Sequence, residues 1–169
     1  MTPADLLTEA FTRIHGIVHR TVDGLSADQL SSRPDGQGNS IAWLIWHLTR
    51  IQDDHVAEVA GVAQAWTAKG WAERFALPLD PADTGYGHDF DQVESVRVPS
   101  GDLLTGYYDA VHEQTLYFLS NLTGDDLERV VDTRWDPPVT LGVRLISVIS
   151  DDLQHAGQAA YAGGLLKIS

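Results

Sequence analysis

The stretch Ile41-Ala42-Trp43-Leu44-Ile45-Trp46-His47-Leu48 decides how this chain folds, because it is an apolar run with one strongly polar residue, His47. A second apolar stretch, residues 145–155, carries Asp151 and His155 four positions apart. Residues at i and i+4 lie on the same face of a helix, so these two can share one ion. A polar group facing a helical core is costly unless it is paired, hydrogen-bonded or bound to metal. The three residues therefore predict one buried divalent-metal site between two packed helices.

Four long segments repeat their apolar residues with the 3.6-residue period of a helix: residues 3 to about 23, 40 to 59, 100 to 122 and 140 to 166. No alternation of useful length indicates a strand. A connection of irregular sequence, residues 63–99, joins the second segment to the third, and so long a connection usually covers or binds something. The pattern predicts an all-α four-helix bundle with a long crossover between helices 2 and 3, forming a single domain over residues 1–169.

The amino-acid composition excludes several classes of binding partner. The 169 residues include only 11 Lys and Arg against 24 Asp and Glu, for a net charge of −13. Such a chain repels nucleic-acid phosphates and anionic lipid, so we expect neither partner. No apolar run reaches the ~20 residues that span a bilayer. With no cysteine present, any metal must accept nitrogen and oxygen ligands. We expect a cytoplasmic protein.

The motif resembles that of the DinB/YfiT-like superfamily. There, a lone His in the second helix is followed, in the fourth, by an acidic residue or His, three residues and then His-x-Gly-Gln. In this sequence the second part is Asp151-Asp152-Leu153-Gln154-His155-Ala156-Gly157-Gln158. Helix order, crossover and length also match, so the resemblance covers essentially the whole chain. It implies a DinB-like bundle that holds its metal through His47, Asp151 and His155.

Many superfamily members carry three His ligands, whereas Asp151 stands here at the first position of the last helix. A His-carboxylate-His set is similar to the metal-binding domain of mycothiol-dependent maleylpyruvate isomerases and mycothiol S-transferases. That similarity implies a zinc-type ion that activates an external low-molecular-weight thiol of the mycothiol type, for transfer to an electrophilic small molecule. Bundles of this kind often bury a helix face against a copy, so we also expect a homodimer.

The donor set by itself leaves other chemistries open. Two imidazoles and one carboxylate suit zinc first, but also nickel or iron. A metal-dependent hydrolase would use bound water instead of a thiol, and an Fe(II) enzyme would use oxygen. A non-catalytic protein that binds a metal or small molecule, such as a stress-response protein, is the third alternative.

Three further residues are expected in a second shell or pocket. Gln158 lies three positions beyond His155, Trp43 lies four before His47 as an apolar wall, and Asp54 lies two turns beyond His47.

A rival pair, His15 and His19, is also four residues apart, but no third ligand is evident beside it in the sequence. We interpret it as a pair at the boundary between core and solvent. His55 and His112 have charged neighbours and are predicted to be solvated, as is one of Asp151 and Asp152. Nothing in the sequence fixes the direction of His88.

Overall fold

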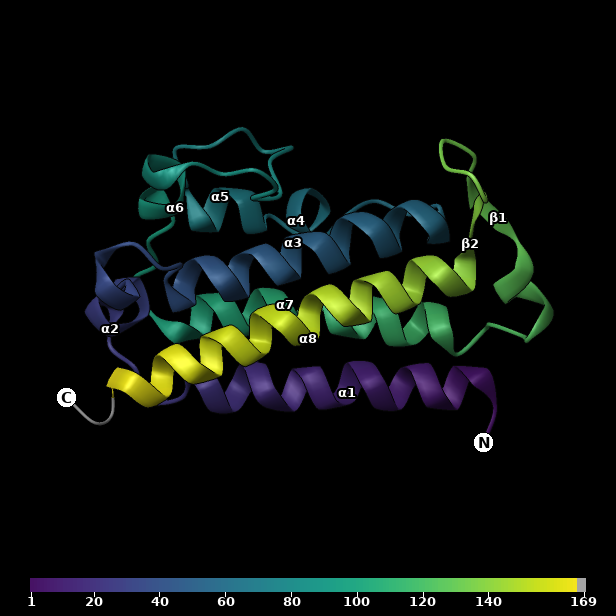
Figure 1. Ribbon diagram of the computed structural model, residues 1–169, viewed down its shortest axis with the longest axis horizontal. Coiled ribbons are helices and arrows are strands. Elements are labelled where there is room, and N and C mark those ends of the chain that lie inside the picture. Colours follow the sequence, from purple (N-terminus) through teal and green to yellow (C-terminus); the bar gives the residue numbers. More distant parts are fainter. Residues whose placement is uncertain (167–169) are drawn as a thin grey trace.

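The computed structural model describes residues 1–166, and four long helices form its bundle (Figure 1). They are α1 (Pro3–Val22), α3 (Ile41–Ala60), α7 (Gly101–Leu119) and α8 (Leu141–Leu166). Helices α1 and α3 each pack against both α7 and α8. The predicted all-α bundle is confirmed, and each predicted helix agrees with the structure to within a few residues. Residues 167–169 of the predicted domain lie outside the described residues.

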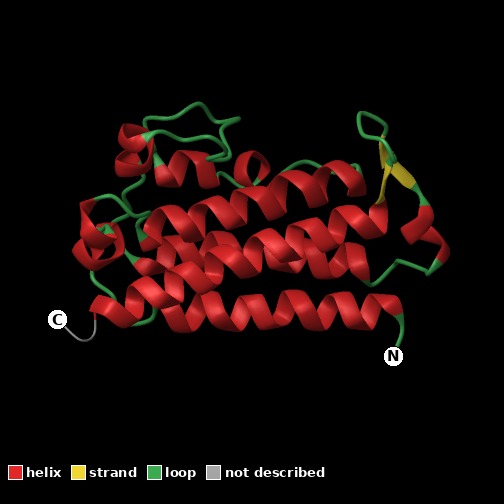
Figure 2. Ribbon diagram, viewed as in Figure 1, coloured by secondary structure: helices red, strands yellow, loops and turns green. Residues whose placement is uncertain are grey.

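Shorter elements fill the connections: α2 (Ala27–Ser31), η1 (Pro34–Gly36), α4 (Ala65–Ala68), α5 (Trp71–Phe75), α6 (Phe90–Ser95) and η2 (Asp125–Glu128). Figure 2 shows the only strands among residues 1–166, which form a small hairpin at one end of the bundle. It pairs β1 (Val130–Asp132) with β2 (Val139–Thr140) in antiparallel fashion. The sequence did not predict it, because strands of three and two residues are too short to produce a periodic pattern.

The direction of the helices explains the length of the crossover. Helices α3 and α7 run the same way along the bundle, so the chain must return from the end of one to the start of the other (Figure 1). A helix of 20 residues such as α3 is about 30 Å long. Residues 61–100 cover that distance and carry α4, α5 and α6 along the outer side of α3.

The buried carboxylate of Asp53 on α3 holds the start of the crossover. It accepts hydrogen bonds from the backbone N–H of Ala65 at 2.9 Å and of Trp66 at 2.8 Å. The hydroxyl of Tyr107 on α7 donates a third at 2.8 Å. One side chain therefore joins α3, α4 and α7 inside the core.

Arg50, one turn earlier on α3, extends this attachment. Its side chain is completely buried, and it donates to the amide oxygen of Gln64 at 2.8 Å and to the carbonyl of Asp83 at 3.1 Å. Gln64 precedes α4 and Asp83 lies in the loop after α5, so a single guanidinium fixes two distant points of the crossover.

No helix within residues 1–166 is long and apolar enough to cross a membrane.

We predict that Asp53→Ala lowers the free energy of unfolding by about 3 kcal/mol, because two backbone N–H groups and the Tyr107 hydroxyl then lie buried without their acceptor. The buried Arg50 guanidinium also loses the carboxylate that lies 3.9 Å away. Urea denaturation followed by circular dichroism measures the change. Asp54→Ala is the matched control, because it removes only one half-buried hydrogen bond, from Gln64, worth about 1 kcal/mol. Equal losses in the two variants would contradict the role of Asp53.

Candidate metal centre

The structure brings His47, Asp151 and His155 together at the interface of α3 and α8. His47 lies on α3, and the other two lie one turn apart on α8. One ligand atom from each residue lies within 4.8 Å of the other two. The rings of His47 and His155 meet edge to face with centroids 4.7 Å apart. The geometry is that of a three-donor cluster able to hold one ion.

The crossover fixes the tautomer of His47. The side chain is buried, and its Nδ1 lies 2.6 Å from the carbonyl oxygen of Thr84. A carbonyl can only accept, so Nδ1 carries the proton and Nε2 keeps its lone pair. Burial lowers the pKa of His47, although the bond to Thr84 opposes the shift. His47 is therefore a neutral imidazole whose Nε2 is available as a ligand.

His155 is oriented in the same way from within its own helix. Its Nδ1–H donates to the amide oxygen of Gln158 at 2.9 Å, which leaves Nε2 directed to Asp151 Oδ1 at 3.6 Å. Interaction with the Asp151 carboxylate raises the pKa of His155, although burial opposes the shift. In each imidazole, the hydrogen bond at Nδ1 fixes the ring and leaves Nε2 facing the centre of the cluster. Hydrogen bonds of this kind orient the histidine ligands of metal sites.

The structure distinguishes the two neighbouring aspartates. Burial alone would raise the pKa of Asp151, but hydrogen bonding and charge from His155 outweigh it, so the pKa is lowered and the group is ionised at neutral pH. Its Oδ2 is buried and has no hydrogen-bond partner within residues 1–166. Asp152 lies completely inside the core, where burial raises its pKa far above the usual range. The prediction that one of the pair is solvated is wrong, and the ionised, half-buried Asp151 is the one suited to bind a cation.

An unpartnered, buried carboxylate oxygen beside two imidazole lone pairs fits a divalent cation. Such a group costs free energy when left without a partner, and a metal ion supplies one.

A chain of hydrogen bonds fixes the wall beside His47. Trp43 stacks on the His47 ring with centroids 4.6 Å apart, and its indole N–H donates to Nδ1 of His88 at 3.0 Å. The Nε2–H of His88 in turn donates to Asp83 at 2.9 Å. The structure therefore gives His88 the direction that the sequence left open. The carboxylate of Asp54, the other predicted neighbour on α3, accepts a hydrogen bond from Gln64 at 2.7 Å.

Gly85 lets the crossover approach His47 closely. Its φ of +91° lies in the region that favours glycine, and a Cβ at this position would lie 2.7 Å from Nδ1 of His47. Four residues of the site were not predicted from the sequence: Asp83, Thr84, Gly85 and His88. The only signal was the segment Asp83-Thr84-Gly85-Tyr86-Gly87-His88, whose paired glycines mark a tight turn within a connection already expected to cover something.

The open side of the cluster lies on α8. Asp151 and His155 keep 35% and 19% of their side chains exposed, whereas His47 is buried. Gln158, the partner of His155, also lines a pocket of about 290 Å³ with Leu44 and Tyr161. Gln158 therefore joins this pocket to His155, which does not itself line it.

Two histidines predicted to be solvated are enclosed instead. His112 is buried on α7 and stacks on His15 with centroids 4.6 Å apart. His55 is half-buried on α3, and its Nδ1 accepts from the guanidinium of Arg144 on α8 at 2.8 Å. Both predictions relied on sequence neighbours, which in a helix point to different sides from the residue in question.

Comparisons with known proteins agree with this architecture. The family model described as the DinB superfamily matches residues 10–159. A crystal structure of a conserved protein from Enterococcus faecalis is similar to the whole chain, with a TM-score of 0.93 and 30% sequence identity, covering 100% of this chain and 99% of that one. No curated protein matches the sequence.

We predict that the two histidines of the cluster titrate on opposite sides of the ordinary value of 6.5 in metal-free protein, His155 above it and His47 below. Ring resonances in a pH series of NMR spectra measure both values. Asp151→Asn should lower the pKa of His155, because the imidazolium loses its carboxylate partner. Asp109→Asn, on α7, removes the same charge away from this interface and should leave the pKa of His155 unchanged. A His47 pKa above that of His155 would contradict the assignment.

Proposed function

The chain belongs to the DinB superfamily, and we propose that it is a metalloenzyme in which His47, Asp151 and His155 hold one divalent ion. The observation that carries the proposal is the orientation of the two imidazoles. Thr84 and Gln158 engage both Nδ1 atoms, so both Nε2 lone pairs point to the space beside Asp151. Hydrogen bonding alone would not require two rings to expose the same atom to the same point.

Zinc is the ion that this donor set suits first. Two neutral imidazoles and a carboxylate are the ligands of many catalytic zinc sites, in which a fourth position stays open. Nickel and iron accept the same nitrogen and oxygen donors, so ligand type alone does not separate the three metals.

The reaction we propose is transfer of a small electrophilic molecule to the sulfur of a low-molecular-weight thiol of the mycothiol type. A divalent ion at the site would lower the pKa of a coordinating thiol, so that the sulfur is available as thiolate near neutral pH. The chain has no cysteine, so the sulfur must arrive with the cosubstrate. The sulfur forms a bond to the electrophilic carbon, the leaving group departs with its electron pair, and the thiol proton passes to solvent.

The surroundings of the cluster support a two-substrate reaction. The buried side is closed by Trp43 and the crossover, whereas the side of Asp151 and His155 is open to solvent. The pocket beside Gln158, at about 290 Å³, lies at the lower end of the size range of small-molecule sites. It accommodates a small electrophile, and the open face leaves room for the thiol.

A second candidate is supported by the same donor set. Two histidines and one carboxylate with open positions are also the facial triad of non-heme Fe(II) enzymes. A metal-dependent hydrolase would require the same ligands with water in place of the thiol. Elemental analysis of untagged protein and identification of the product separate these reactions from thiol transfer.

We predict that Gly85→Ala weakens zinc binding at this site by about 10–100-fold, as expected when a second-shell partner is disturbed. The added methyl group would lie 2.7 Å from Nδ1 of His47 and displace the ring from its bond to Thr84. Competition with a chromogenic zinc chelator measures the affinity, and His155→Ala, which removes a ligand, should lose one equivalent of zinc altogether.

Gly87→Ala is the matched control for that measurement. Gly87 also has a positive φ, of +75°, but a Cβ there would meet nothing within 4 Å. The two variants share the backbone strain and differ in the contact with His47. Equal zinc affinity in both, or full zinc retention in His155→Ala, would refute the ligand assignment.

We predict that the zinc-loaded protein forms a thioether from an electrophile with a chromogenic leaving group only when a thiol is supplied, with mycothiol faster than glutathione. Mass spectrometry of the product and the rate of leaving-group release measure the reaction. Removal of the metal with a chelator should abolish the enzymatic rate, and zinc should restore it. A product that carries oxygen from water would favour the hydrolase, and oxygen uptake by iron-loaded protein would favour the Fe(II) enzyme.

A further inference from the structure

A second group of metal-ligating side chains lies at the opposite interface of the bundle, between α1 and α7. His15 and His19 are one turn apart on α1 and face Asp109 of α7. Their Nε2 atoms lie 2.9 and 2.7 Å from the same oxygen, Oδ1 of Asp109. One ligand atom from each residue lies within 4.8 Å of the other two. The third ligand missing from the sequence pattern is thus supplied across the helix interface.

The arrangement repeats that of the His47 cluster. In each case two residues at i and i+4 on one helix meet a third donor on its packed neighbour, and the donors are two imidazoles and one carboxylate. The first cluster uses the α3–α8 interface and the second the α1–α7 interface, which share no helix. The second cluster is therefore separate from the site already described and can be tested independently of it.

We infer that His15, His19 and Asp109 form a second divalent-metal site, which takes zinc or a similar ion that prefers nitrogen and oxygen donors. In the metal-free protein both Nε2–H groups donate to Asp109. When an ion binds the same three atoms, each imidazole changes tautomer, so that Nδ1 carries the proton and Nε2 offers its lone pair.

The distances are compatible with this exchange. Ligand atoms about 2.0–2.1 Å from a tetrahedral ion lie roughly 3.3 Å apart, so the present 2.7 and 2.9 Å separations need to open by about half an ångström. The side chains have that freedom, because His15, His19 and Asp109 keep 34%, 38% and 48% of their surface exposed. The same exposure gives solvent ions direct access.

One side of the cluster is enclosed by protein. The rings of His15 and His19 lie 4.3 Å apart by centroids, and the buried His112 stacks on His15 at 4.6 Å. Nδ1 of His112 is buried with no hydrogen-bond partner among the first 166 residues. The packing of His112 restricts the His15 ring and so keeps its Nε2 near Asp109.

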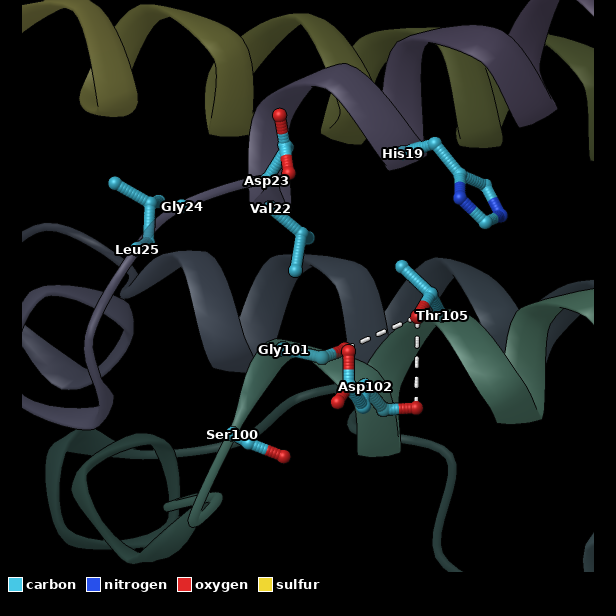
Figure 3. Close-up of a pocket in the computed structure, with 9 residues that line it drawn as sticks. All are labelled: His19, Val22, Asp23, Gly24, Leu25, Ser100, Gly101, Asp102 and Thr105. Atoms are coloured by element: carbon cyan, nitrogen blue, oxygen red, sulfur yellow. Dashed lines mark hydrogen bonds between the residues drawn. The ribbon is translucent and has the colours of Figure 1, made fainter.

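Beyond the cluster, His19 also lines a pocket of about 310 Å³ between α1 and α7. Figure 3 shows the His19 ring at the edge of this pocket, with Thr105 of α7 on the opposite wall. Asp23 and Asp102 also line it and add negative charge, in a chain whose net charge is −13. Such a pocket attracts cations and leaves room for the water or small ligand that completes the coordination of an ion bound by three protein groups.

Zinc binding to the untagged, chelator-treated full chain tests the inference, by equilibrium dialysis followed by elemental analysis. We expect two equivalents in wild type, one in Asp109→Asn, one in His47→Ala and none in the double variant. Asp102→Asn removes an equal charge two turns earlier on α7 and should still bind two. If Asp109→Asn binds as much zinc as wild type, or if Asp102→Asn loses as much as Asp109→Asn, no second site exists.

The test separates this site from the proposed catalytic one. If the His47 cluster holds no metal, wild type binds one equivalent that His47→Ala retains and Asp109→Asn loses. A second measurement uses the wild-type protein alone. Paramagnetic nickel, added below one equivalent per site, should broaden the ring NMR resonances of His15 and His19. Broadening confined to His47 and His155 would overturn the second site.

Discussion

The candidate site depends on the hydrogen bonds that the buried carboxylate of Asp53 accepts. By accepting two backbone N–H groups of the crossover and the hydroxyl of Tyr107, it holds three elements around one point of α3. Arg50 extends the attachment to Asp83. The loop that follows Asp83 then lies where the Thr84 carbonyl meets His47. A polar network in the core thereby sets the tautomer of a residue in the site.

The two clusters illustrate how a four-helix bundle makes donor sites. Each interface brings one face of a helix against another, so an i, i+4 pair needs only one residue on the neighbour to complete a set of three. The difference lies in the surroundings. His47 is buried, and the crossover fixes its ring through Nδ1, whereas His15 and His19 are partly exposed and bond Asp109 directly. The first site is more rigidly organised before any ligand binds, and the second is more accessible.

Much of the fold was predictable because its signals are local. The apolar period placed four helices within a few residues of their ends. The short hairpin gave no such signal. Charge states were less predictable, as two adjacent aspartates show. The pKa of Asp151 is lowered and that of Asp152 is raised. The difference arises because α8 turns Asp151 toward the cluster and Asp152 into the core.

The sequence by itself determined the helices, the absence of cysteine and the spacing of Asp151 and His155, since each depends on residues within about one turn or on composition alone. Only the tertiary structure decided which donors meet. Thr84 reaches His47 across 37 positions, and Asp109 reaches His15 across 94. Such contacts depend on how helices pack and how loops cross them. A periodic pattern in the sequence does not predict which residue of another helix will make the contact.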